Sequence, residues 1–214
     1  MFTGLVEEIG KVREMSRISA YAISLRVRAS LIMDDVKIGD SIAVNGVCLT
    51  VSELDQNHFS ADVMPETVKA TSLTSLRIGS PVNLERAMPA NGRFGGHFVS
   101  GHVDAAGTIL SRTPRENAIY YEIKVPGGSS PFMMQKGSIA VEGTSLTIFD
   151  ATPETFTVSL IPLTAKGTIL GKKKPGDLVN IEFDLLAKQL CHLASLQEEK
   201  SGQMSSLLAS NGYM

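Results

Sequence analysis

The chain has 214 residues, enough for one large domain or two of about 100 residues each, and 43% of its residues are hydrophobic. Its formal net charge is −2 and no stretch approaches the roughly 20 apolar residues that span a membrane, so neither nucleic acid nor a membrane is an expected partner. The two cysteines, Cys48 and Cys191, are not spaced like a disulfide framework or a zinc site, which predicts a reduced, cytoplasmic protein.

The sequence repeats itself with an offset of 97 residues. Ser41–Val51 reads SIAVNGVCLTV and Ser138–Ile148 reads SIAVEGTSLTI. The same offset relates Gly4 to Gly101, and it continues to the end of each copy. A repeat of this length indicates a duplicated structural unit.

Each copy consists of short runs of β-branched and aromatic residues separated by turn signals such as Asn45-Gly46, which is typical of antiparallel strands. About six strands in such a unit close most naturally into a barrel, because closure removes exposed strand edges. We therefore predict an all-β fold of two tandem six-stranded barrels in residues 1–90 and 91–185, joined by a glycine-rich linker around residues 90–96.

The pattern changes after Asp184, where leucines recur every three or four residues among polar side chains. This spacing predicts an amphipathic helix within residues 186–214, followed by a tail beyond Gly202. The leucine stripe can pack against its own barrel or against further copies of the chain, and the sequence leaves both interpretations open. Its members are Leu186, Leu190, Leu193 and Leu196.

Nucleophilic and hydroxyl side chains recur at matched positions of the two copies. In the strand after Asn45-Gly46, alternation places Cys48 and Thr50 on one face, and the second copy repeats this with Ser145 and Thr147. Such groups often only fill gaps or face solvent. Because further hydroxyls are paired across the repeat, we favour two equivalent pockets for a polar, hydroxylated ligand. These further pairs are Ser41 with Ser138, and Thr67 with Thr164.

The copies differ in their ionisable residues. The second copy has His102, Lys136, Glu142 and Asp184 where the first has Leu5, Gly39, Asn45 and Ala87. Lys136 and Glu142 are each explained as solvated charges, but the set together predicts that both copies bind and the second supplies acid–base groups. His102 is the natural proton shuttle near neutral pH. We expect no metal site, because neither His58 nor His192 has a second ligand at metal spacing.

Several segments together resemble the riboflavin synthase family of the alpha-chain type, over residues 1–190. They are MFTGLVE, NGVCLTV, GGHFVSGHVD, EGTSLTI and LGKKKPGDLVNIEFD. The resemblance implies Greek-key barrels, a homotrimer formed through the C-terminal helix, and no cofactor. It also implies the dismutation of two 6,7-dimethyl-8-ribityllumazine molecules, in which a four-carbon transfer gives riboflavin and 5-amino-6-(D-ribitylamino)uracil.

The resemblance also implies site residues. The matching catalytic positions are His102, Cys48, Ser145, Thr147, Asp184, Ser41, Lys136 and Glu142. The matching substrate-binding positions are Phe2, Thr3, Gly4, Val6, Thr50, Met64, Glu66, Thr67, Asn83, His97, Gly101, Val103, Ile161 and Thr164. In this scheme Cys48, Ser145 or a water adds to C7 of the lumazine, while His102 with Thr147 and Asp184 helps to deprotonate its C7 methyl group.

The family resemblance further implies that the working site lies between the first barrel of one subunit and the second barrel of its neighbour. Association with lumazine synthase is a further implied partner interaction. The main alternative function is a non-catalytic carrier of lumazine or flavin with the same fold. The flavin-binding barrel of a reductase is disfavoured, because no βαβ pattern or dinucleotide fingerprint accompanies the barrels.

Overall fold

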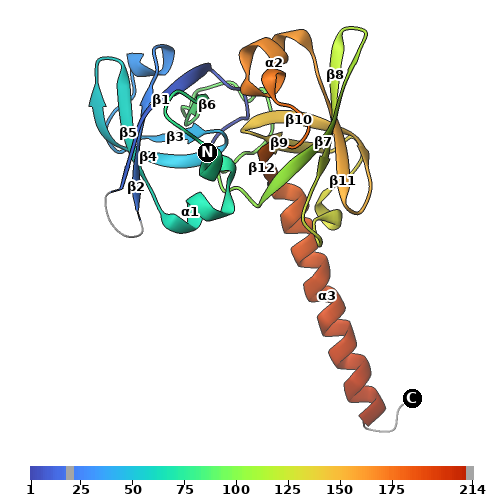
Figure 1. The fold of residues 1–214 in the computed structure, drawn as a ribbon. Coiled ribbons are helices and arrows are strands. Elements are labelled where there is room, and N and C mark those ends of the chain that lie inside the picture. The colour runs from blue at the N-terminus through green and yellow to red at the C-terminus, as the bar shows by residue number, and fades with distance from the viewer. Residues whose placement is uncertain (18–21, 211–214) are drawn as a thin grey trace.

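The computed structural model describes residues 1–17 and 22–210, with side chains up to residue 197, and contains two closed β-barrels and a C-terminal helix (Figure 1). The first barrel consists of β1 (Glu8–Arg17), β2 (Ile23–Arg28), β3 (Ser41–Val44), β4 (Val47–Asp55), β5 (His58–Val63) and β6 (Pro81–Arg86). The second consists of β7 (Ala105–Arg115), β8 (Ala118–Lys124), β9 (Ser138–Val141), β10 (Thr144–Ala151), β11 (Thr155–Leu160) and β12 (Leu178–Phe183).

The helices follow the same duplication. The α-helices are α1 (Pro65–Ala70), α2 (Pro162–Gly167) and α3 (Leu185–Ser210). The 3-10 helices are η1 (Leu31–Asp34), η2 (Ser72–Ser75), η3 (Ser130–Phe132) and η4 (Ile169–Lys172). A proline at the first position of α1 and of α2 ends the preceding strand and starts the helix, because proline cannot donate to a strand ladder but suits the first helical turn.

The strand order around the first barrel is β1-β2-β5-β4-β3-β6, and the second barrel has the same cyclic order with β7 in the place of β1. β2 pairs with β5 and β3 with β6, and these non-sequential pairings give the Greek-key connection. Bulges at Val12/Glu14 and Val51/Glu53 return in the second barrel at Ile109/Ser111 and Ile148/Asp150, where they help the strands bend into a closed sheet. The predicted tandem all-β fold is confirmed.

Each barrel has its own hydrophobic core. Ile42 and Phe59 are fully buried in the first barrel, as are Ile139 and Phe156 in the second. Burial of one such side chain stabilises the fold by about 1.5–3 kcal/mol. Along β4 the burial alternates, with Leu49 inside the barrel and its neighbours Cys48 and Thr50 outside, as the sequence pattern predicts.

Two segments cross between the barrels. We call residues 1–7 the first crossing segment and residues 98–104 the second crossing segment. They lie antiparallel at Phe2 and Val99, whose backbones exchange hydrogen bonds of 2.8 and 3.2 Å. Each segment then contacts the other barrel: Ser145 N–H donates to Gly4 O at 2.7 Å, and Cys48 N–H donates to Gly101 O at 2.9 Å. The barrels are therefore joined by a reciprocal exchange of the segments that precede them.

A buried glutamate anchors each crossing segment to its own barrel. Glu85 on β6 accepts hydrogen bonds from the N–H and Oγ1 of Thr3 (2.7 and 2.8 Å) and from Gly4 N–H (3.0 Å). Glu182 on β12 accepts from the N–H and Oγ of Ser100 (2.6 and 2.7 Å) and from Gly101 N–H (2.9 Å). Backbone donors that would otherwise be buried without partners are thereby satisfied.

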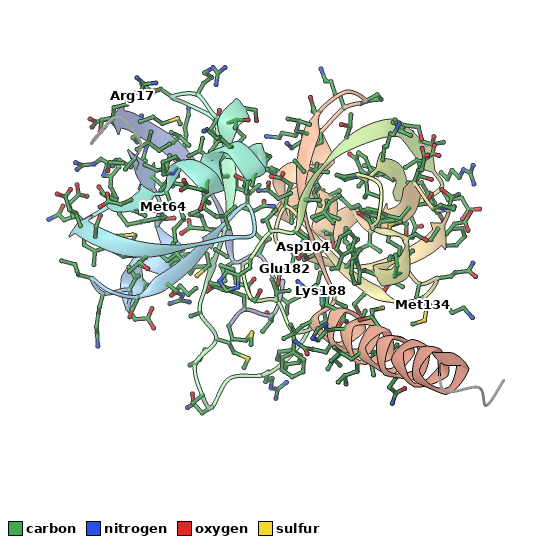
Figure 2. All side chains as sticks on the ribbon, turned by 90° about the horizontal axis from the view of Figure 1, so that it is seen from below. Arg17, Met64, Asp104, Met134, Glu182 and Lys188 are labelled. Atoms are coloured by element: carbon green, nitrogen blue, oxygen red, sulfur yellow. The ribbon has the colours of Figure 1, made fainter. Side chains whose placement is uncertain are left out.

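The helix α3 projects away from the second barrel (Figure 1). Near its start Lys188 Nζ forms an ion pair of 2.9 Å with Asp104, and Figure 2 shows these two residues close to Glu182. The leucine stripe remains exposed, with 58% of Leu186 and 67% of Leu190 accessible, so the interpretation that it packs against its own barrel is wrong. The helix also continues past Gly202 to Ser210, contrary to the predicted tail; residues 211–214 lie outside the described residues.

Candidate active site

The first barrel has a groove on its outer surface where β4 meets the end of β5 and α1. It has a volume of about 370 Å³ and is lined by Cys48, Thr50, Asp62, Met64 and Thr67, among others. Met64, which is exposed, marks this surface in Figure 2. The structure thus brings together four of the residues singled out from the sequence. Asp62, near the end of β5, also lines the groove, and the sequence analysis did not predict it as a site residue.

The second crossing segment lies against the strand that carries this groove. Gly101 binds the backbone of Cys48 and has φ +83°, and a Cβ on it would lie 2.5 Å from Cys48 Cβ, so only glycine allows the approach. Val103 packs against the core of the first barrel. The backbone of His102, between them, therefore lies beside Cys48. The predicted grouping of His102 with Thr147 and Asp184 stays a prediction.

The second barrel presents the equivalent surface. Ser145 receives the first crossing segment through Gly4 O, and Thr147 is exposed on the outer face of β10. Ile161 is 57% exposed just before α2, and Thr164 is half-buried on that helix. Val6 follows Gly4 on the crossing segment. Each barrel's surface thus combines its own strand and helix with the segment that precedes the other barrel.

A hydrogen-bonded pair lies at the second surface. His97 Nδ1 is 2.7 Å from Ser145 Oγ, and the imidazole is only 7% exposed. Burial lowers the pKa of His97, and the nearby carboxylate of Asp184 acts in the opposite direction. Asp184 ends the second barrel and caps α3, since its Oδ1 accepts the Leu186 N–H at 2.8 Å. Sequence reasoning gave His97 only as a binding residue and did not find this pair.

Four predicted site residues are buried inside the molecule. Phe2 and Glu142 have no exposed area, Asn83 is 2% exposed and Thr3 is 6% exposed. Asn83 Nδ2 donates to Glu142 O at 2.8 Å, while Phe2 and Thr3 belong to the first crossing segment. In this structure these residues make buried contacts between the barrels and the crossing segments, and their assignment to the site stays a prediction.

Glu142 is also not the solvated charge that its sequence context indicates. Its Oε1 accepts hydrogen bonds from Asn180 N–H (2.7 Å) and Ser72 Oγ (2.9 Å), and its Oε2 has no partner among the described residues. Burial raises the pKa of this carboxyl, and Lys173, whose Nζ lies 3.9 Å away, counteracts this only in part. Glu142 is thus a buried carboxyl in the interface between the barrels.

The remaining predicted residues are more dispersed. Ser41 is opposite Thr50 on β3 but lines a different cavity, of about 470 Å³, with Glu7 and Arg86. Lys136 is exposed in the turn before β9, where its backbone has φ +67°. Glu66 is exposed on α1 and is not among the residues that line the groove. Sequence spacing alone does not distinguish these positions from the groove residues.

Among the side chains of residues 1–17 and 22–197, no three His, Cys, Asp or Glu groups gather as metal ligands would. In the same part of the chain no helix is both long and apolar enough to cross a membrane.

Comparison with known proteins identifies the duplicated unit. The family model of the lumazine binding domain matches twice, at residues 3–87 and 100–184. The riboflavin synthase of Bacillus subtilis is 49% identical over 100% of both chains. The chain belongs to the riboflavin synthase family. The riboflavin synthase of Actinobacillus pleuropneumoniae is 50% identical over 89% of this chain and 88% of its own.

Solved structures agree on the fold. The crystal structure of LumP complexed with riboflavin matches with a TM-score of 0.79 at 24% identity, covering 86% of this chain and 99% of LumP. LumP complexed with 6,7-dimethyl-8-(1'-D-ribityl) lumazine matches with a TM-score of 0.76 at 23% identity, covering 85% of this chain and 98% of LumP. At this level of identity the likeness concerns the architecture of the barrels.

Proposed function

We propose that the chain catalyses the dismutation of two 6,7-dimethyl-8-ribityllumazine molecules to riboflavin and 5-amino-6-(D-ribitylamino)uracil. The observation that carries this proposal is that both barrels keep the outward surface with its polar groups, in a chain 49% identical to a riboflavin synthase over its full length. Two similar surfaces suit two identical reactants. Holding both reactants in place removes much of the entropic cost of their encounter.

In this proposal the first groove binds one substrate through the exposed side of β4 and the start of α1. Thr50 and Thr67 are placed to hydrogen-bond the ribityl hydroxyls, and Asp62 adds an acceptor at the same edge. Cys48 and Ser145, both partly exposed next to a crossing segment, are the candidate nucleophiles for C7. His102 contributes a titratable group beside Cys48. This reaction draws only on protein side chains and the two substrates.

We further propose that the chain works as a cytoplasmic homotrimer in which the first barrel of one subunit meets the second barrel of its neighbour. The exposed leucines of α3 support this, because a stripe of apolar side chains on a projecting helix is costly in water unless another copy covers it. Replacing Leu190 and Leu193 by Glu should yield a monomer in analytical ultracentrifugation, with loss of turnover. A trimer that survives this change would place the interface elsewhere.

A carrier of lumazine or flavin is the second candidate, and the fold shared with ligand-bound LumP favours it over unrelated functions. The experiment that separates the two is incubation of the purified protein with 6,7-dimethyl-8-ribityllumazine alone. The enzyme produces riboflavin and the uracil product in equal amounts, followed by absorbance and chromatography. Tight binding without riboflavin formation would establish the carrier and refute the enzyme.

A further inference from the structure

The two candidate nucleophiles occupy equivalent positions but have different surroundings. Ser145 Oγ lies 2.7 Å from His97 Nδ1, within a strong hydrogen bond. Cys48 Sγ, its counterpart in the first barrel, forms no hydrogen bond within the described part of the chain. The two barrels therefore differ at the pair of candidate nucleophiles, although their folds are nearly the same.

The position of His97 is built by the fold. His97 N–H donates to Thr3 O at 3.2 Å, and Thr3 is in turn held by Glu85. The preceding Gly96 lies so close that a Cβ on it would be 2.0 Å from Thr3 O and 3.1 Å from Ser145 Cβ. The linker segment can bring the imidazole to Ser145 only because residue 96 is glycine.

The imidazole is suited to accept a hydrogen bond. Only 7% of the His97 surface is exposed, and its Nε2 has no hydrogen-bond partner among the described residues. Burial lowers the pKa of His97, which keeps the ring neutral at neutral pH. The charged group that acts on it is Asp184, at the junction of β12 and α3, and its carboxylate stabilises positive charge on the ring. A neutral imidazole beside a carboxylate is a common arrangement for polarising a hydroxyl.

We propose that His97 is a positioning residue for Ser145: its Nδ1 accepts a hydrogen bond from the Ser145 hydroxyl and so orients the Ser145 oxygen toward the substrate of the second barrel. The kinetic consequence of this inference rests on the proposed function, because it requires turnover of the substrate. It makes the barrels chemically unequal: the second presents an oriented, polarised hydroxyl, and the first presents a thiol without such a partner. The two substrate molecules are then distinguished by the barrel that binds them.

The kinetic test compares His97→Gln, Ser145→Ala and the double variant, with His58→Gln, at the half-buried first residue of β5, as a control. We expect kcat to fall about 100-fold in each single variant, with KM changed less than about threefold. The double variant should be no slower than Ser145→Ala, because His97 acts through Ser145. His58→Gln should leave kcat within about twofold. Multiplicative losses in the double variant, or an unchanged kcat in His97→Gln, would overturn the proposal.

The pH profile gives a second kinetic readout. Protonation of His97 removes its acceptor, so wild-type kcat should fall as the pH drops through the lowered pKa of this residue. His97→Gln should lose this acidic limb while remaining folded, as checked by its melting temperature. An identical acidic limb in His97→Gln would contradict the role.

An experiment without turnover separates this inference from the proposed function. In the ¹⁵N-labelled full-length protein, the ring nitrogens of His97, assigned by comparison with His97→Gln, should show an unprotonated Nδ1 and a protonated Nε2 at pH 7.5. In Ser145→Ala this Nδ1 signal should shift. A proton on Nδ1 would overturn the inference even if riboflavin is formed. The expected tautomer in a protein that does not form riboflavin would refute only the proposed function.

Discussion

The hydrogen bonds from the crossing segments to Glu85 and Glu182 lead to a prediction about how each glutamate affects the opposite barrel. Glu85 belongs to the first barrel, but the segment it anchors ends against Ser145 of the second. Glu182 belongs to the second barrel and anchors the segment that lies against Cys48 of the first. Replacing either glutamate by alanine should therefore loosen the surface of the opposite barrel.

The magnitude follows from the hydrogen bonds removed. Glu85→Ala leaves the N–H groups of Thr3 and Gly4 without their acceptor, in a place where Thr3 is 6% exposed. Each unpaired buried donor costs about 1–3 kcal/mol, so the docked segment should lose about 2–6 kcal/mol relative to its released state. Since every 1.4 kcal/mol is about tenfold in an equilibrium constant, segment opening should increase by about 30-fold or more.

Amide hydrogen exchange measures this opening directly. The Ser145 N–H is protected by Gly4 O and the Cys48 N–H by Gly101 O, so each reports on one crossing segment. In Glu85→Ala we expect faster exchange at Ser145 by about 30-fold or more, with a much smaller change at Cys48. Glu182→Ala should show the reverse pattern and serves as the matched control.

The reasoning would be refuted if Glu85→Ala accelerated exchange at Cys48 and left Ser145 protected. That result would mean that each glutamate supports only its own barrel. Equal acceleration at both amides would indicate global unfolding, and a repeat at lower temperature would then show whether the local opening separates from it.

Three further predictions concern the interface and the helix. Burial raises the pKa of Glu142, so its protonation stabilises the folded state fully below the ordinary value of 4.5, and this contribution is lost as pH rises through the folded-state pKa. Urea unfolding should show Glu142→Gln gaining stability relative to wild type as the pH rises above that value. Gly101→Ala introduces a Cβ 2.5 Å from Cys48 Cβ at φ +83° and should cost about 1–3 kcal/mol in the same assay. Lys188→Ala removes the ion pair with Asp104 and should lower unfolding free energy by at most about 1 kcal/mol while raising proteolysis of α3.

Each of these predictions has a clear contrary result. If the unfolding free energies of Glu142→Gln and wild type changed with pH in parallel, Glu142 would not be the group that causes the pH dependence. Glu85, whose pKa burial also raises, is present in both proteins and cannot account for a difference between them. Gly127→Ala, where a Cβ meets nothing within 4 Å, is the control for Gly101→Ala, and equal losses would refute the steric argument. Unchanged proteolysis in Lys188→Ala would show that other contacts hold the helix.

The sequence predicted much of the first groove. The alternation in β4 places Cys48 and Thr50 outside the barrel because strand side chains alternate whatever the partner strand is. Thr67 was found because its hydroxyl recurs as Thr164 in the second copy, and Met64 follows from the family resemblance. Strand alternation and repeat spacing can both be read directly from the sequence.

The residues between the two barrels could not be predicted in this way. Asn83 is a polar residue within β6 and Glu142 lies in the turn before β10, and only their packing between the two barrels shows that they are buried. Their hydrogen bonds join residues 38 to 86 positions apart in the chain, so no local sequence pattern predicts them. The repeat shows which residues are equivalent, but not which copy they contact.

The sequence by itself determined the duplication, the two barrels and the helix, because repeat spacing, strand alternation and leucine periodicity are encoded over short distances. The tertiary structure alone decided the exchange of the crossing segments. That exchange places His102 beside Cys48 and the linker residue His97 against Ser145. The physical reason is that a backbone N–H group on each barrel, at Cys48 or Ser145, finds its acceptor on the segment that precedes the other barrel. Packing between parts of the chain that are distant in sequence determines this pairing.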